Sequence, residues 1–137
     1  MIRALVLYGY GLNCDHETKF ALDQVGVQAR RVHVNELIGG QERLADYHLL
    51  ALPGGFSWGD DHGAGVILGL RLKLALRSQL EEFIAAGKII LGICNGFQVL
   101  VNMGLLPGFD GRYFDRQVAL IHNDCGNFRD AWVHLRV

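Results

Sequence analysis

Short apolar runs alternate with stretches of helical periodicity along most of the chain. Residues 2–8 (IRALVLY) and 88–93 (KIILGI) are continuous apolar runs, typical of strands buried on both faces of a sheet, and we expect 88–93 at its centre. Residues 28–34 (QARRVHV) alternate polar and apolar positions, and residues 48–52 (HLLAL) form an apolar run before Pro53. The pattern therefore predicts a strand in each of these segments.

Segments with helical spacing separate the predicted strands. The first covers residues 16–26, where Phe20, Leu22 and Val25 are expected to cluster on one side. Asp15 is a suitable N-cap for this helix, because a short side-chain oxygen can accept a hydrogen bond from the first turn.

The longest helical pattern covers residues 64–86 and ends before Gly87, a residue type that favours the end of a helix. Its apolar stripe consists of Leu72, Leu76, Leu80, Phe83 and Ile84. Residues 35–47 predict a weak helix, and residues 95–104 predict a short one.

Two later segments, residues 117–124 (QVALIHND) and 131–137 (AWVHLRV), are further strand candidates, as a hairpin or an extension of the sheet. Strands that alternate with helices predict one α/β domain over residues 1–137, with a mostly parallel sheet between helices on both faces. Because the chain ends on a strand-like segment without a closing helix, we expect it to be a fragment of a longer domain.

Three predicted loops follow strands and are candidates for a site. They cover residues 9–15 (GYGLNCD), 53–61 (PGGFSWGDD) and 94–96 (CNG). In open parallel sheets ligands bind at the carboxyl ends of the strands. We therefore expect these loops to lie close together.

Composition and charge exclude several classes of partner. With 13 Lys and Arg against 14 Asp and Glu, the net charge is −1, so no basic surface for nucleic acid or an anionic membrane is expected. The first apolar run is far shorter than the ~20 residues that cross a bilayer. Cys14, Cys94 and Cys125 lack the spacing of a disulfide framework or a zinc site. We expect a soluble, cytoplasmic protein with free thiols, no metal and no cofactor.

Cys94 is the strongest candidate for chemistry. It stands between a predicted strand and a predicted helix, the position of a nucleophile elbow, a sharp turn that exposes one side chain at the sheet edge. Gly92 and Gly96 suit such a turn, because a larger side chain would crowd the two backbones. The helix N-terminus would favour the reactive thiolate, and the N–H of Asn95 would point to a developing oxyanion.

A cysteine in an isolated Gly-x-Cys-x-Gly pattern is equally often a small buried packing residue. A second glycine pair, Gly54 and Gly55, follows another predicted strand and can bring a further backbone N–H to the same oxyanion. The combination favours an acyl-transfer site with Cys94 as its nucleophile. Cys14 is expected to shape the first loop, with lining of the site as the alternative.

The segment GICNGFQ, residues 92–98, resembles the Gly-x-Cys-x-Gly-x-Gln signature of class I glutamine amidotransferases. Four further segments extend the resemblance over nearly the whole chain. They are similar to the class I glutamine amidotransferases that serve purine synthesis: LPGGFSWGDD, NMGLLPG, GLNCDHET and HNDCGNFRDAWVHLRV. The resemblance implies a flavodoxin-like three-layer sandwich. It also implies that Cys94 attacks the side-chain amide of glutamine, forms a glutamyl thioester and releases ammonia.

The resemblance assigns further roles by position. Gly55 and Asn95 would supply the oxyanion-hole N–H groups, and Gln98 with the segment from Gly54 to Phe56 would hold the substrate glutamine. The implied partners are an ATP-dependent synthetase subunit, which uses the ammonia to convert formylglycinamide ribonucleotide to the amidine, and a small accessory subunit. The sequence has no Gly-x-x-x-x-Gly-Lys loop, which agrees with ATP being bound elsewhere.

The histidine and glutamate that complete the triad of this family, two residues apart, have no counterpart in the sequence. Of the six histidines only His122, in HND, has an acid at that spacing, and we interpret it as a surface or glutamine-pocket residue. The chain is either the N-terminal part of the domain or a divergent member with impaired glutaminase. In both cases we expect it alone to hydrolyse glutamine slowly or not at all. The competing interpretations are another cysteine-elbow protein, such as a peptidase, and a docking domain.

Overall fold

Four parallel strands form the centre of the structure, a computed structural model that describes residues 1–134 and 136. They are β1 (Arg3–Tyr8), β2 (Gln28–His33), β3 (Leu49–Leu52) and β4 (Ile89–Gly92), in the order β2-β1-β3-β4. In the register of the sheet, Val6 of β1 lies between Arg31 of β2 and Ala51 of β3. The four predicted strands and the α/β class are confirmed, and the order is that of flavodoxin-like sheets.

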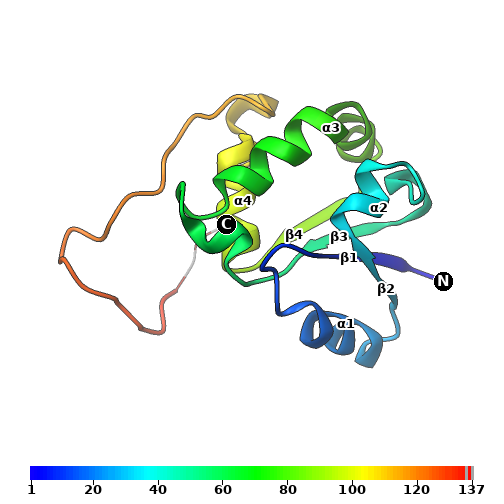
Figure 1. The fold of residues 1–137 in the computed structure, drawn as a ribbon, viewed down its shortest axis with the longest axis horizontal. Coiled ribbons are helices and arrows are strands. Elements are labelled where there is room, and N and C mark those ends of the chain that lie inside the picture. The colour runs from blue at the N-terminus through cyan, green and yellow to red at the C-terminus, as the bar shows by residue number, and fades with distance from the viewer. Residues whose placement is uncertain (135, 137) are drawn as a thin grey trace.

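Helices cover both faces of the sheet, as Figure 1 shows. One face carries α1 (Asp15–Gln24), and the other carries α2 (Val34–Ile38), α3 (Val66–Ala85) and α4 (Asn95–Met103). Short 3-10 turns occupy Leu44–Asp46, Ser57–Asp60 and Phe109–Gly111. Among the described helices, none combines the length and apolarity that crossing a membrane requires.

The two faces of the sheet bury very different amounts of apolar side chain. On the α3 face, the predicted stripe packs on large strand residues such as Leu5, Leu7 and Leu52, although Ile84 is only half-buried. On the α1 face, the buried residues are small: Ala4, Val6, Ala29 and Ala51. The α3 face therefore supplies most of the hydrophobic stabilisation, because that term follows the apolar area removed from water.

The predicted apolar side of α1 is wrong for two of its three residues. Phe20 and Val25 are 65% and 75% exposed, whereas Leu22 packs on the small residues of the sheet. Phe20 is two residues before Leu22 and so lies on another side of the helix. Val25 is the C-cap, beyond the last helical residue Gln24. Asp15 is also not the N-cap: Cys14 holds that position, and Asp15 lies buried in the first turn, where it pairs with Arg31.

The expected central strand, β4, is an edge strand of the described sheet. It pairs with β3 alone among the described residues. Ile89 and Leu91 are 61% and 39% exposed. A continuous apolar run thus predicts the strand correctly but not its position, because apolarity on both faces does not say which neighbours are present.

The two later strand candidates are absent from the described structure. Residues 117–124 and 131–134 have no strand partner and belong to a long loop, orange to red in Figure 1, that leaves the body of the molecule and turns back near its end. Residues 135 and 137 of the second candidate lie outside the described residues. Ile121 is 87% exposed. An alternating pattern cannot form a strand by itself, because its backbone groups need a neighbouring strand.

The weak helix predicted over residues 35–47 divides into α2 and the first 3-10 turn. A capping box begins α2: the side chain of His33 accepts a hydrogen bond from the N–H of Asn35, and Glu36 accepts one from the N–H of His33. Gly40, with φ of +78°, follows the helix and interrupts it.

Candidate active site

The loops that follow β1 and β3 are hydrogen-bonded to each other at the carboxyl edge of the sheet. The carbonyl of Gly54 accepts from the N–H groups of Asn13 and Cys14 at 3.2 and 3.3 Å. The N–H of Phe56 donates to the carbonyl of Gly11 at 2.8 Å. The first and second candidate loops are therefore one backbone unit, as their place after parallel strands predicted.

Cys94 lies on a sharp turn between β4 and α4. Its backbone has φ of 52° and ψ of −114°, and it is the N-cap of α4. The N–H of Ile93 donates to the carbonyl of Leu52 at 3.0 Å, so the chain is still tied to β3 one residue before the turn. Positive φ in a non-glycine residue costs on the order of 1–3 kcal/mol and concentrates at functional sites. The predicted elbow is confirmed as a backbone geometry, and Cys94 is exposed on it.

Two glycines allow this turn to pack against its neighbours. A Cβ on Gly96 would lie 1.9 Å from the carbonyl oxygen of Leu52, and one on Gly92 would lie 2.6 Å from a methyl carbon of Leu100. No side chain fits at the first of these distances. The expectation that larger residues would crowd strand and helix is confirmed.

Gly54 lies between two thiols. A Cβ on Gly54 would be 3.3 Å from the Cβ of Cys94, 3.8 Å from its Sγ and 3.5 Å from the Sγ of Cys14. Cys14 therefore lines the same site as Cys94, in addition to shaping the first loop. Cys125 differs, because its Sγ hydrogen-bonds to Asn127 in an exposed loop.

The two N–H groups predicted to form an oxyanion hole belong to buried residues, Gly55 of the loop after β3 and Asn95 of the turn. Gly55, with φ of +144°, packs so closely on Gly11 that a Cβ would lie 2.3 Å from its carbonyl oxygen. Within the described part of the chain, neither the N–H of Gly55 nor that of Asn95 donates a hydrogen bond. The role of both groups at an oxyanion stays a prediction.

The side chain of Asn95 connects the turn to the loop after β3. Asn95 is fully buried, and its Oδ1 accepts from the N–H of Ser57 at 3.1 Å. Its Nδ2 donates to Asp60 at 3.3 Å and to Gln98 at 3.1 Å. Sequence reasoning assigned only the backbone N–H of Asn95 and missed this side chain, although a buried amide in an apolar helix requires partners.

The other predicted substrate-binding residues lie around this network. Gln98 is half-buried on the first turns of α4, and Phe56 is 65% exposed at the rim. Near the same rim, the ring of Tyr10 stacks on that of Trp58 with 4.4 Å between ring centroids. Hydrogen bonds from Asn35 and then Arg71 hold the pKa of Tyr10 below its ordinary value.

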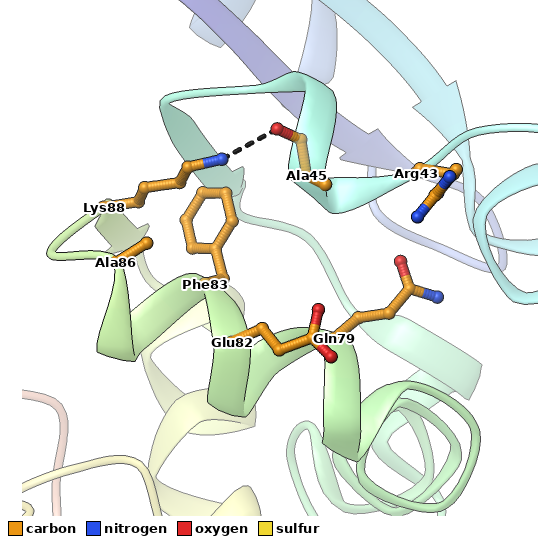
Figure 2. A pocket seen from close by; sticks show the side chains of 7 residues that line it. All are labelled: Arg43, Ala45, Gln79, Glu82, Phe83, Ala86 and Lys88. Atoms are coloured by element: carbon orange, nitrogen blue, oxygen red, sulfur yellow. Dashed lines mark hydrogen bonds between the residues drawn. The ribbon is translucent and has the colours of Figure 1, made fainter.

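No histidine among the described residues hydrogen-bonds to Cys94: the side chain of His48 accepts from Arg3 and that of His33 from Asn35. His122 is exposed in the segment that leaves the sheet. A separate pocket lies at the opposite, amino end of β3 and β4 (Figure 2). There Lys88 donates to the carbonyl of Ala45 at 2.8 Å and lies over the ring of Phe83. Neither a cysteine nor any of the predicted site residues lines this pocket.

Residues 1–137 match the family described as the CobB/CobQ-like glutamine amidotransferase domain, and the chain belongs to this family. The class I glutamine amidotransferase resemblance drawn from residues 92–98 is thereby confirmed.

Curated relatives show which members of the family the chain is similar to. The chain is 46% identical over 136 residues to "Phosphoribosylformylglycinamidine synthase subunit PurQ" of Methanococcus maripaludis, covering 98% of this chain and 50% of that protein. It is 41% identical over 138 residues to the protein of the same name from Dehalococcoides mccartyi, covering 99% and 52%. The chain spans about half the length of the curated relatives it matches.

A solved structure has the same fold. "Structure of PurLQS from Thermotoga maritima" aligns with a TM-score of 0.64 and 37% identity, over 77% of this chain and 45% of that chain. The flavodoxin-like class predicted from the resemblance is confirmed by this likeness together with the strand order.

Proposed function

We propose that this chain is the nucleophile-bearing part of the glutaminase subunit of phosphoribosylformylglycinamidine synthase. The observation that carries the proposal is the strained turn at Cys94, at the N-terminus of α4 and in contact with Gly54. Family membership and the printed names of the relatives support it. The product ammonia serves an ATP-dependent synthetase in de novo purine biosynthesis.

In the first half of the reaction, the thiolate of Cys94 attacks the side-chain carbonyl carbon of glutamine. The new carbon–sulfur bond places negative charge on the carbonyl oxygen, and the N–H groups of Gly55 and Asn95 stabilise that oxygen. Collapse of this intermediate breaks the carbon–nitrogen bond. Ammonia leaves with a proton from a general acid, and a glutamyl thioester stays on Cys94.

In the second half, water attacks the thioester carbon, the carbon–sulfur bond breaks, and glutamate leaves. Gln98 and the segment from Gly54 to Phe56 hold the glutamine in both halves. A general base must take the proton of the water. We assign this base to a His-x-Glu segment of the family that is absent from the 137 residues, and we leave His122 as a surface or pocket residue.

The proposed partners follow from the fate of ammonia. A synthetase subunit that binds ATP and formylglycinamide ribonucleotide consumes it, together with a small accessory subunit. The relative of known structure is named as an assembly, PurLQS, which supports a multi-subunit enzyme. We propose a cytoplasmic location, in agreement with three cysteines that form no disulfide in the described structure.

The test is alkylation of Cys94 by a chloroketone analogue of glutamine, because a chloroketone reacts with a thiolate without needing the general base. We expect one adduct, located by peptide mass on Cys94, that disappears in Cys94→Ser and is slowed by free glutamine. Cys125 is the internal control, since it is exposed but lies outside the site.

Equal labelling of all three cysteines, with no protection by glutamine, would contradict the proposal and favour a docking domain of this fold. A chloroketone analogue with a hydrocarbon side chain in place of the amide is the second reagent. If it labels Cys94 as fast as the glutamine chloroketone does, the result would instead favour another cysteine-elbow enzyme.

A further inference from the structure

The hydrogen bonds of Asn95 have only one possible direction. The N–H of Ser57 can only donate, so the atom that faces it at 3.1 Å must be the carbonyl oxygen of the Asn95 side chain. The amide nitrogen of Asn95 therefore faces Asp60 and Gln98. The carboxylate of Asp60 is an acceptor, which agrees with this assignment.

The direction continues into Gln98. Since the amide nitrogen of Asn95 donates, the Gln98 atom 3.1 Å away must be its carbonyl oxygen. The NH2 group of Gln98 is then the group left to face a ligand. A backbone N–H of the loop after β3 thus sets which end of the Gln98 amide points away from Asn95.

The same side chain holds a strained segment. Ser57 and Asp60 are the ends of a 3-10 turn in which Trp58 and Gly59 have φ of 54° and 68°. Asp60 has φ of 58°. Trp58 and Asp60, which are not glycines, favour other conformations unless their surroundings hold them. Asn95 contacts both ends of the turn, so it holds the loop that contains Gly54 and Gly55 against the Cys94 turn.

We propose that the Asn95 side chain is a positioning residue that orients Gln98 so that its NH2 group donates to an oxygen of the bound glutamine. This inference rests on the proposed function and adds a source of substrate orientation to it. Asn95 does not touch the reacting atoms with its side chain; it acts through Gln98 and through the loop after β3.

Two substitutions test the direction of these hydrogen bonds. Asn95→Asp retains an oxygen for the N–H of Ser57 but donates nothing to Gln98. Gln98→Glu still accepts from Asn95 but presents an oxygen where the NH2 group was. We expect each to slow alkylation of Cys94 by the glutamine chloroketone by about tenfold or more, the loss of roughly one good hydrogen bond.

Iodoacetamide separates positioning from general damage, since it reacts with the thiol and needs no substrate pocket. Both substitutions add a carboxylate close to the thiol, and this charge affects the reaction of the thiolate with both reagents alike. We therefore expect the ratio of the chloroketone rate to the iodoacetamide rate at Cys94 to fall about tenfold in both variants. The effects of the two substitutions should not add in the double variant, because they break one interaction.

Asn102→Asp is the matched control. Asn102 lies on the same helix and donates to the carbonyl of Ala64 at 2.9 Å. Its substitution should lower the free energy of unfolding without changing the ratio of the two alkylation rates.

Three outcomes would overturn the inference. They are an unchanged rate ratio in either folded variant, an equal fall of both rates, and additive effects in the double variant. If Asn95→Asp does not fold, Gln98→Glu alone decides, because the direction of the hydrogen bonds predicts its loss independently. If the wild-type chain shows no preference for the glutamine chloroketone, the proposed function itself fails.

Discussion

The two ends of the parallel strands are built by different means. At the carboxyl end, the backbone itself makes the site: Cys94 has positive φ, and Gly96 approaches the carbonyl of Leu52 too closely for any side chain. At the amino end, the pocket of Figure 2 is formed by side chains, among them Lys88 and Gln79, and the nearby Gly87 has open space around it. The difference indicates that the carboxyl end tolerates less change in backbone position than the amino end.

Replacing one glycine by alanine at each end of the strands is expected to show the largest difference in stability between the two ends. Gly96→Ala places a Cβ against a backbone oxygen, which cannot move without separating β3 from α4, so we expect a loss of more than about 4 kcal/mol in the free energy of unfolding. Gly87→Ala, with φ of +67° but no neighbour within 4 Å, should cost only about 1–2 kcal/mol. Denaturant unfolding measures both, and equal losses would contradict the comparison.

A smaller change sharpens what the carboxyl end does. Gly54→Ala would bring a methyl group to 3.3 Å from Cys94, a contact that a slight shift can relieve. We expect about 1 kcal/mol of destabilisation but on the order of tenfold slower alkylation of Cys94 by the glutamine chloroketone. Gly69→Ala is the control, since its Cβ would meet the carbonyl oxygen of Val99 in α4 at 3.2 Å, a contact of similar closeness that involves neither thiol of the site. If Gly69→Ala lowers the rate of chloroketone alkylation as much as Gly54→Ala does, the effect of Gly54→Ala is not local to the site.

At the amino end, loss of a side chain should matter for stability alone. Lys88→Met removes both the hydrogen bond to Ala45 and the ammonium group over the ring of Phe83, so the expected cost is about 1 kcal/mol. Alkylation of Cys94 should be unchanged. A slower reaction in this variant would mean that the two ends are coupled.

The smallest effect is expected at Ser57. Its hydroxyl is buried, and no described residue hydrogen-bonds to it. Ser57→Ala should therefore change the free energy of unfolding by less than about 1 kcal/mol, with exposed Ser78→Ala as the comparison. A larger loss in thermal or denaturant unfolding would show that the Ser57 hydroxyl has a partner, such as an ordered water molecule.

Features that depend on local pattern could be predicted from the sequence, and features that depend on distant partners could not. The stripe of α3 and the four strands follow from periodicity, and the turn at Cys94 follows from glycines between a strand and a helix. The exposure of Phe20 could have been predicted from its spacing, two residues before Leu22. The edge position of β4 and the absence of strands at 117–124 instead depend on what packs beside each segment. Periodicity carries no information about that.

The site divides in the same way. Residues 92–98 predict the elbow, because the glycines that it needs are close in sequence. The bridge from Asn95 to Ser57 and Asp60 joins residues more than thirty positions apart, and a buried asparagine gives no sign of its partners until the loop is in place. The contact of Cys14 with Gly54 is equally non-local.

The most direct measurement is the rate at which iodoacetamide alkylates each cysteine with and without L-glutamine, resolved by peptide mass. A glutamine site at the carboxyl end predicts that L-glutamine slows the reaction of Cys94, that D-glutamine does not, and that Cys125 reacts equally in all conditions. An unchanged rate at Cys94, or equal slowing of Cys94 and Cys125, would contradict the assignment of Cys94 as the nucleophile of a glutaminase.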